Sequence, residues 1–162
     1  MIHTLKPGEQ NDYVDTLTSI FSAFSQYSRY LVAYGMGAKT LPGENNPTCQ
    51  LFSLTGDYSD PFIENEEQML SCYAETIKAV EITLPIYYKP IVKFVCDLAQ
   101  MEFGTASDAT HIKNYYVLTL LMAGMVDDPE DSINEILRAA ELPISVVIIR
   151  VGDGANADGD AF

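Results

Sequence analysis

The two most apolar stretches of the chain lie near its end, on either side of an acidic segment. Tyr115–Met122 is a near-continuous apolar run that ends at Ala123-Gly124, and Ile144–Ile149 is a second run of the same kind. Runs rich in Val, Ile and Tyr are typical of strands buried on both faces. An acidic loop and a short amphipathic helix are predicted between them. Asn114–Val151 is therefore predicted to be a β-α-β unit whose two strands are parallel.

The remainder of the chain mixes helical and extended patterns. Apolar residues recur at helical spacing in three stretches, which predicts three further helices. Pro90 falls in the first turn of the last of these, where its missing N–H costs little. The predicted helices are Asn11–Tyr27, Glu66–Val80 and about Tyr87–Met101.

Two shorter extended segments complete the predicted elements. Arg29–Met36 is predicted to be a strand and Gln50–Leu54 a short edge strand, while Leu41–Cys49 contains two prolines and a glycine and is predicted to be a loop. The resulting order α-β-β-α-α-β-α-β predicts a layered α/β domain over residues 1–152, followed by a Gly/Asp/Ala-rich tail over 153–162. In open α/β sheets ligands bind beyond the carboxyl ends of the strands, so the loop that starts at Ala123 is the first candidate for a functional site.

Charge narrows the classes of partner. The 162-residue chain has a net charge of −14. This charge argues against nucleic-acid binding, which needs a basic surface, and against direct contact with anionic lipid unless a cation bridges them. A basic protein surface or a divalent cation fits better, and a solvated acidic surface that only maintains solubility is equally compatible.

The cysteines and the first residues of the chain indicate in which cellular compartment the protein is found. Cys49, Cys72 and Cys96 are odd in number and form no CxxC motif, which favours free thiols and an intracellular protein. No signal-peptide h-region follows Met1, and no apolar run approaches the roughly 18 residues that a membrane span needs. We therefore expect an intracellular location, cytoplasmic or associated with the cytoskeleton.

Four ordered segments of the chain resemble the von Willebrand factor A-type domain of copines, intracellular proteins that carry two C2 domains before it. The resemblance extends from about Ile2 to Gly152 and implies a Rossmann-like, doubly wound sheet and a role in binding proteins rather than in catalysis. The segments are YGMGAK (34–39), AETIKAVEITLPIYYKPIV (74–92), NYYVLTLLMAGMVDD (114–128) and LPISVVIIRVG (142–152).

The resemblance also implies a metal-ion-dependent adhesion site, in which hard oxygen ligands hold Mg²⁺ or Ca²⁺ and a partner carboxylate takes the open position. Its DxSxS loop would lie upstream of His3. The family's Thr position falls on Ile86, with Thr83 close by as an alternative alignment, and its Asp position falls on Ala123. Ile and Ala side chains cannot ligate a hard cation, so a degenerate site that holds no metal and no other cofactor is expected.

The first, central strand of the family's sheet is also expected to be absent from this chain, and so is the last one after Gly152. An unpaired apolar strand edge invites another strand. Three outcomes stay open: a strand supplied by another chain, direct pairing of the neighbouring strands in a degenerate fold, or a chain that is part of a longer polypeptide. A strand from a partner or from a missing upstream segment is favoured.

Other motifs carry weaker signals. The acids of Asp127–Ser132 suit a helix N-terminus with Asp128 as N-cap, although a weak Ca²⁺ site or a docking patch for a basic partner is an alternative. Asn156–Asp160 resembles an EF-hand loop but lacks the bidentate Glu. Asp57–Asp60 resembles a DxSxS loop but lacks the second Ser, and Gly35-Met36-Gly37 fits a tight turn better than a dinucleotide fingerprint.

The sequence as a whole predicts a non-catalytic protein-interaction module, a structural or scaffolding subunit of an intracellular assembly. The alternative is part of a copine that recruits partner proteins to phospholipid membranes in response to calcium. We expect other protein chains as partners, one of which completes the sheet, no nucleic acid, and no direct membrane contact. The predicted partner-binding residues are Ile86, Tyr87, Tyr88, Ala123, Gly124, Met125, Asp127 and Asp128.

Overall fold

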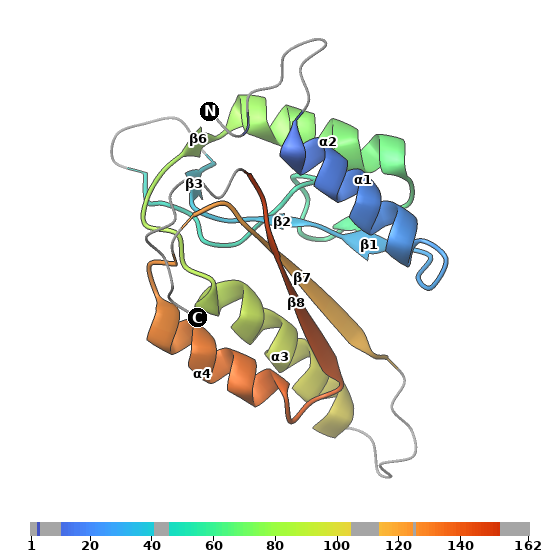
Figure 1. The fold of residues 1–162 in the computed structure, drawn as a ribbon, viewed down its shortest axis with the longest axis vertical. Helices are drawn as coiled ribbons and strands as arrows, with labels where there is room; N and C mark the ends of the chain where they lie inside the picture. Colours follow the sequence, from blue (N-terminus) through green and yellow to red (C-terminus); the bar gives the residue numbers. More distant parts are fainter. Residues whose placement is uncertain (1–2, 4–10, 41–45, 105–113, 125, 153–162) are drawn as a thin grey trace. The chain divides into compact units, whose positions relative to one another are not determined.

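The computed structural model describes His3 and residues 11–40, 46–104, 114–124 and 126–152. These residues form a mixed α/β structure with four helices and eight short strands (Figure 1). The chain divides into two compact units, which are described separately: unit 1 comprises Met1–Leu84 with Val151–Phe162, and unit 2 comprises Pro85–Arg150. Within the described ranges, no helix is long and apolar enough to cross a membrane.

Unit 2 is built on two long parallel strands. Strand β7 (Tyr116–Met122) pairs with β8 (Ile144–Arg150) along its whole length, from Tyr116 opposite Ile144 to Met122 opposite Arg150. Helix α4 (Pro129–Ala139) connects them. The predicted β-α-β unit with parallel strands is therefore confirmed, and the strand bounds differ from the predicted ones by only one residue.

Two helices cover one face of this strand pair. Helix α3 (Lys89–Gly104) packs beside α4 and against β7, and α4 packs against β8 (Figure 1). Val92 and Cys96 of α3 are fully buried, and Leu120, Met122 and Ile144 are the buried residues of the two strands. The Arg138 guanidinium joins the helices at their surface, donating to Asp97 at 2.7 Å and to Glu135 at 3.2 Å.

Unit 1 contains two helices and three minimal strand pairs. Helices α1 (Asp12–Phe24) and α2 (Glu66–Ala79) pack together, and each begins at an asparagine whose side chain accepts backbone N–H bonds, Asn11 and Asn65. The strand pairs are antiparallel and two residues long in each strand. They are β1 (Leu31–Val32) with β5 (Phe62–Ile63), β2 (Tyr34–Gly35) with β4 (Phe52–Ser53), and β3 (Ala38–Lys39) with β6 (Glu81–Ile82).

Gly35 is required by the packing of β2 on β4. A Cβ at this position would overlap the ring of Phe52, which is buried and lies on the paired strand. Glycine has only a hydrogen in place of a side chain, so the Phe52 ring fills the space that a Cβ at position 35 would occupy. The glycine therefore serves close approach of a neighbouring strand, with a turn at Gly37, where φ is 68°.

The three predicted helices before the β-α-β unit are confirmed, with bounds that differ by at most three residues at either end. The single strand predicted over Arg29–Met36 is wrong in detail. The segment breaks at Ala33, whose carbonyl accepts the N–H of Leu54, and its halves pair with different strands. Strands β3, β5 and β6 were not predicted, because two residues are too short to show a periodic pattern.

The α/β class is thus confirmed. In the described part of the chain the strands form four two-stranded sheets rather than one continuous sheet. The three cysteines are free thiols, as predicted; Cys96 is buried and the other two are half-buried. Residues 41–45 of the predicted loop and the whole tail over 153–162 lie outside the described residues.

Candidate functional site

Two loops of unit 2 that are distant in sequence are joined by hydrogen bonds at the end of β7. The backbone N–H of Ile86 donates to the Asp127 carboxylate at 2.7 Å. In the other direction, the N–H of Asp127 donates to the Ile86 carbonyl at 3.3 Å. The sequence places these residues in different loops, so the pair of bonds fixes the segment before α3 to the segment before α4.

Asp128 holds the start of α3. Its two carboxylate oxygens accept the backbone N–H groups of Tyr88 and Lys89, each at 2.9 Å. The first amides of a helix have no partner within the helix, and an anion there is favoured by the helix dipole as well. We call Ile86, Tyr88, Lys89, Asp127 and Asp128 the loop clamp, since four hydrogen bonds between these five residues bind the two loops together.

The predicted capping role of Asp128 needs a correction. Asp128 occupies the N-cap position of α4, where its carbonyl accepts the N–H of Ser132 at 2.9 Å, but its side chain makes no capping bond to that helix. Pro129 follows at the first helical position, where its missing N–H costs little. The carboxylate instead caps α3, a contact that only the tertiary structure provides.

An ion pair lies next to the loop clamp. The Lys89 ammonium is 3.0 Å from the Asp131 carboxylate, and both side chains are largely exposed. The hydrogen bond and the negative charge of Asp131 raise the pKa of Lys89. Exposed pairs of this kind contribute little free energy, so the ion pair adds less than the charge-assisted bonds of Asp128. Of the four acidic residues between positions 127 and 131, three therefore bind residues at or just before the start of α3.

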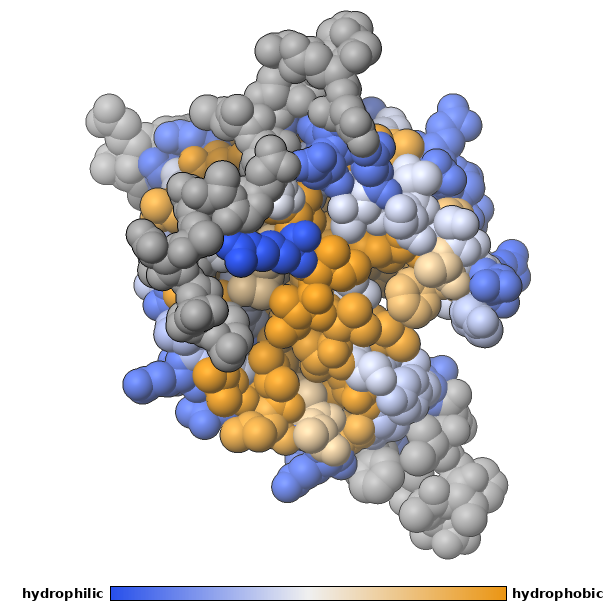
Figure 2. Space-filling view, in the orientation of Figure 1, coloured by the Kyte–Doolittle hydropathy of each residue, from blue (hydrophilic) through white to orange (hydrophobic). Residues whose placement is uncertain are grey.

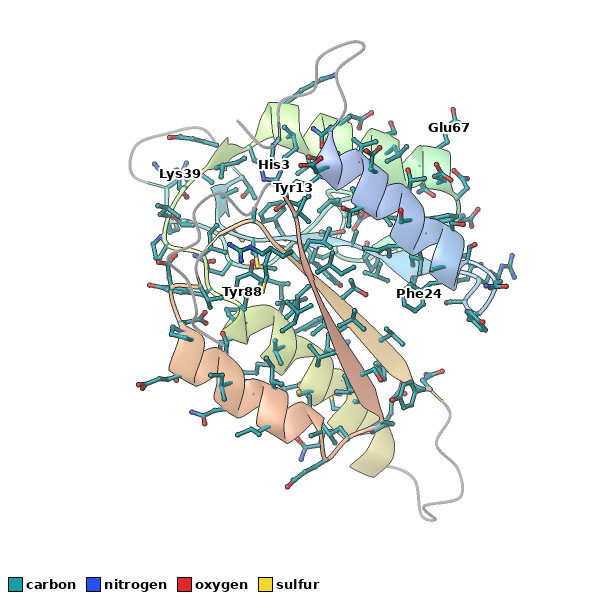
Figure 3. The ribbon with its side chains drawn as sticks, viewed as in Figure 1. His3, Tyr13, Phe24, Lys39, Glu67 and Tyr88 are labelled. Atoms are coloured by element: carbon teal, nitrogen blue, oxygen red, sulfur yellow. The ribbon has the colours of Figure 1, made fainter. Side chains whose placement is uncertain are left out.

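The predicted tyrosine pair divides into one buried and one exposed residue. Tyr88 is only 6% exposed, and its hydroxyl donates to the Leu121 carbonyl at 3.3 Å (Figure 3). Tyr87 is 38% exposed. Tyr88, one of the two predicted partner-binding tyrosines, is therefore buried at the start of α3, where its hydroxyl contacts β7. Tyr87 alone presents an aromatic surface to solvent here.

Ala123 and Gly124 follow β7 directly and are both exposed. A Cβ added at Gly124 would meet nothing within 4 Å, so the backbone at this point is open to solvent. Met125, the last residue of the predicted set, lies outside the described residues. The structure therefore brings Ile86, Tyr88, Asp127 and Asp128 into one hydrogen-bonded group, with Tyr87, Ala123 and Gly124 on exposed backbone nearby in the sequence.

The side chains of these loops offer few oxygen ligands to Mg²⁺ or Ca²⁺. Neither Ile86 nor Ala123 has a side-chain oxygen, and the carboxylates of Asp127 and Asp128 already accept N–H groups. Hard cations need several oxygen ligands at once. Over the described residues, no group of three or more His, Cys, Asp or Glu side chains could hold a metal ion.

Two other segments that the sequence analysis considered have local roles in unit 1. Asp57 accepts the N–H and the hydroxyl of Ser59 at 2.7 and 2.6 Å, which closes a tight turn and lowers the pKa of the Asp57 carboxyl. Thr83 shares a hydrogen bond with the Thr48 hydroxyl at 2.8 Å and donates its N–H to the Gly37 carbonyl. Both residues are therefore engaged in holding loops together.

The sequence analysis missed one aromatic cluster in unit 1. The His3 ring lies 4.2 Å from the ring of Tyr13, and its Nδ1 is 3.0 Å from the Tyr73 hydroxyl (Figure 3 labels His3 and Tyr13). Burial lowers the pKa of His3 and, as the largest of several causes, raises the pKa of Tyr73 to about 12. Tyr13 and Tyr73 lie on the apolar sides of their helices, but no sequence pattern pairs either of them with His3.

Comparison with models of known protein families gives a match over almost the whole chain. The family model described as Copine matches residues 1–161. The matched range includes both loops of the clamp, the β-α-β unit of unit 2 and all the elements of unit 1.

Proposed function

The chain belongs to the copine family, and we propose that it is a non-catalytic protein-interaction module with a degenerate metal-ion-dependent adhesion site. It would serve as a structural or scaffolding subunit of an intracellular assembly. We also propose that its fold is of the von Willebrand factor A type. The parallel β7–α4–β8 unit, with α3 on the same face, supports this, because such units are the repeating element of doubly wound sheets.

The loop clamp is the observation that carries the proposal. Its bonds hold two loops in fixed positions beyond the carboxyl end of β7, where ligands of open α/β sheets bind. A loop that is already ordered loses little conformational entropy on binding, which favours a stable contact with a partner. The exposed residues beside the clamp, Tyr87, Ala123 and Gly124, are the proposed contact surface.

The composition of this surface favours protein over small molecule or ion. Tyrosine is enriched among the residues that contribute most to protein interfaces, and small residues such as Ala123 and Gly124 let a partner approach the backbone. Three of the four carboxylates near the loops are held by backbone amides or by Lys89. Binding here would therefore rest on shape and on apolar contact rather than on a bridging cation.

A strand from a partner chain is the second part of the proposal. Among the described strands, β7 pairs only with β8, so no described strand pairs with its other edge. Tyr115, which directly precedes β7, is 63% exposed, and Val117, near the start of the strand, is 44% exposed. Addition of a strand along this edge would satisfy the backbone groups and cover apolar side chains.

Family membership favours one alternative, calcium-dependent recruitment of partner proteins to phospholipid membranes. In that case C2 domains outside this chain would bind the lipid, and the net charge of −14 would keep this chain away from the membrane surface. The two proposed functions differ in whether the binding of partner proteins depends on Ca²⁺. Partner binding by the proposed interaction module is independent of Ca²⁺, whereas recruitment of the second kind requires it.

Affinity purification of the tagged 162-residue chain from cells, followed by mass spectrometry, tests the contact surface. Tyr87→Ala is expected to reduce recovery of specific partners by about tenfold or more, as is typical of an aromatic interface residue. Tyr27→Ala is the matched control, since Tyr27 is 82% exposed in unit 1. An unchanged set of partners for Tyr87→Ala, or a set that is lost with a calcium chelator, would contradict the proposal.

Titration calorimetry tests the degenerate metal site independently. The chain is expected to show no stoichiometric uptake of Mg²⁺ or Ca²⁺, and Ala123→Asp alone is expected not to create it, because one carboxylate does not complete a site for a hard cation. Thermal unfolding with and without each ion is the companion measurement. Tight stoichiometric binding, or a rise in the unfolding midpoint with either ion, would show that the site is functional.

A further inference from the structure

The His3 ring contacts both helices of unit 1. It lies 4.2 Å from the Tyr13 ring of α1, and its Nδ1 is 3.0 Å from the Tyr73 hydroxyl of α2. The two tyrosine rings are buried and stack on each other, with centroids 6.2 Å apart. Where Figure 1 draws α1 and α2, Figure 2 shows mainly hydrophilic side chains, so the buried rings lie on the sides of the helices that are turned away from solvent. His3 therefore joins α1 to α2 through one ring contact and one hydrogen bond.

The hydrogen bond of His3 has a direction that Asn11 helps to set. The Asn11 Oδ1 caps α1 by accepting the N–H groups of Tyr13 and Val14 at 2.9 and 3.2 Å. Its amide nitrogen is therefore the group that hydrogen-bonds to the Tyr73 hydroxyl. Burial, the largest cause, raises the pKa of Tyr73 to about 12 despite the bond from Asn11. The Tyr73 hydroxyl thus keeps its proton and donates it to the His3 Nδ1. A ring nitrogen that accepts carries no proton, so His3 is neutral in this arrangement.

Protonation of His3 is incompatible with this hydrogen bond. An imidazolium carries a proton on both ring nitrogens, so Nδ1 can no longer accept the Tyr73 hydroxyl proton. Burial of the ring opposes the charge as well, and it lowers the pKa of His3. Both effects favour the neutral ring in the folded chain.

The groups around the His3 ring do not compensate a positive charge. The titratable side chains that face it among the described residues are Tyr13 and Tyr73, and both are neutral because burial raises their pKa values. Burial is the only cause that shifts the pKa of His3, so the charged groups of α1 and α2 do not offset it. Of the other titratable groups near these tyrosines in the sequence, three are exposed carboxyls and one is a half-buried thiol: Asp12, Asp15, Glu75 and Cys72.

We propose that His3, Tyr73 and Asn11 form a pH-sensitive switch between α1 and α2, which is intact while His3 is neutral and breaks when His3 takes up a proton. The Tyr73 hydroxyl is shared by His3 and by the residue that caps α1, so loss of the first bond loosens the start of that helix. The switch lies in unit 1 and is independent of the contact surface proposed for unit 2.

The effect of pH has a defined sign. The folded chain binds the His3 proton more weakly than the unfolded chain, in which the pKa is 6.5. The contact therefore stabilises unit 1 fully above pH 6.5, and its contribution decreases as the pH falls below that value. Each unit by which the pKa is lowered corresponds to about a tenfold decrease in the folding equilibrium constant at acidic pH.

A pH titration followed by NMR tests the protonation step in the full chain. The ring signals of His3 are expected to titrate below pH 6.5. Tyr73→Phe is expected to raise the His3 pKa, because the neutral ring loses the hydrogen bond that favours it. His111 is the other histidine of the sequence, and His111→Asn distinguishes the two sets of signals. A His3 pKa at or above 6.5, or the same pKa in Tyr73→Phe, would overturn the proposal.

Hydrogen exchange measured by NMR at about pH 5.5 and 7.5, on either side of the usual histidine pKa, tests the loosening of α1. After correction for the intrinsic effect of pH, the amides of Tyr13 and Val14 are expected to be less protected at the lower pH, because their bonds to Asn11 are weakened. The ladder of β7 and β8 serves as the internal control and should not change.

His3→Asn is the matched variant for this measurement. The asparagine oxygen can accept the Tyr73 proton but does not titrate, so protection at the start of α1 should be the same at both pH values. His111→Asn should retain the response of the wild-type chain, and circular dichroism verifies that each variant is folded. A wild-type chain with equal protection at both pH values, or a folded His3→Asn variant that responds as the wild type does, would overturn the proposal.

Discussion

The strands of the two units differ in how much of their pairing is encoded locally. In unit 2, β7 and β8 are seven residues each and stay in register along their whole length. In unit 1, each strand is two residues long, and every pair joins segments that are separated by other elements. A seven-residue strand has enough apolar residues to define its own position, whereas a two-residue strand depends on what packs around it.

The hydrogen bonds of the two units show the same contrast. β7 and β8 pair along an unbroken ladder, so loss of one side chain leaves most of the pairing intact. In unit 1 a few contacts hold each pair, such as the bond between Leu54 and Ala33 and the close approach of Gly35 to Phe52. We therefore expect single substitutions to have local consequences in unit 1 and to act through the packed core in unit 2.

The largest effect is expected at the centre of unit 2. Leu120 is 3% exposed on β7, and Leu120→Ala removes buried methyl groups and leaves a cavity, which should lower the free energy of unfolding by about 2–5 kcal/mol. Urea denaturation followed by circular dichroism measures the change. Val117→Ala, on an exposed face of the same strand, is the control, with an expected effect within about 0.5 kcal/mol. Equal effects would show that β7 is not the core strand of this unit.

A steric substitution tests the dependence of unit 1 on one contact. In Gly35→Ala the new methyl group overlaps the Phe52 ring, so we expect a loss of about 1–3 kcal/mol from overpacking. Hydrogen exchange measured by mass spectrometry should show faster exchange in β2 and β4 and unchanged exchange in β7 and β8. Phe52→Leu in the same chain should recover part of the loss, because the smaller side chain leaves room for the methyl group.

The Phe52→Leu variant tests whether overlap with the Phe52 ring causes the destabilisation by Gly35→Ala. If Gly35→Ala is equally destabilising with Phe52 and with Leu at position 52, the close approach of the two strands is not the reason for the glycine. If β7 and β8 also exchange faster, the contrast between the two units is weaker than their strand lengths suggest.

The smallest effect is expected in the loop clamp. Asp128→Ala removes both carboxylate bonds to the start of α3, which should cost about 0.5–2 kcal/mol, the range for loss of a helix cap. Exchange of the first amides of α3 should accelerate, while the ladder of β7 and β8 stays protected. Glu130→Gln, at an acid in the first turn of α4, is the control and should change stability by less than about 0.5 kcal/mol. Slow exchange at Tyr88 and Lys89 in Asp128→Ala would contradict the capping role.

The loops before α3 and α4 show what a local sequence pattern can and cannot predict. The resemblance to copines places Ile86 at one position of the family's adhesion site, Asp127 lies in the loop after β7 that was predicted to border the same site, and the two residues are hydrogen-bonded in the structure. The chemistry of the acids was predicted less well. Asp128 was expected to cap its own helix, which is the local solution, but its carboxylate bonds to α3. A local pattern identifies a residue suited to capping without specifying which helix it caps.

The sequence by itself determined the four helices, the two long strands and their parallel pairing, because the helices show periodic apolar spacing and the strands are near-continuous apolar runs on either side of a helix. It also determined the membership of the chain in the copine family, through segments spread along its length. The tertiary structure alone decided the pairing of the two-residue strands, the burial of Tyr88 beside the exposed Tyr87, and the partners of Asp127 and Asp128. These features depend on groups brought together from distant positions, and the free energy of such contacts is not encoded in the pattern of any one segment.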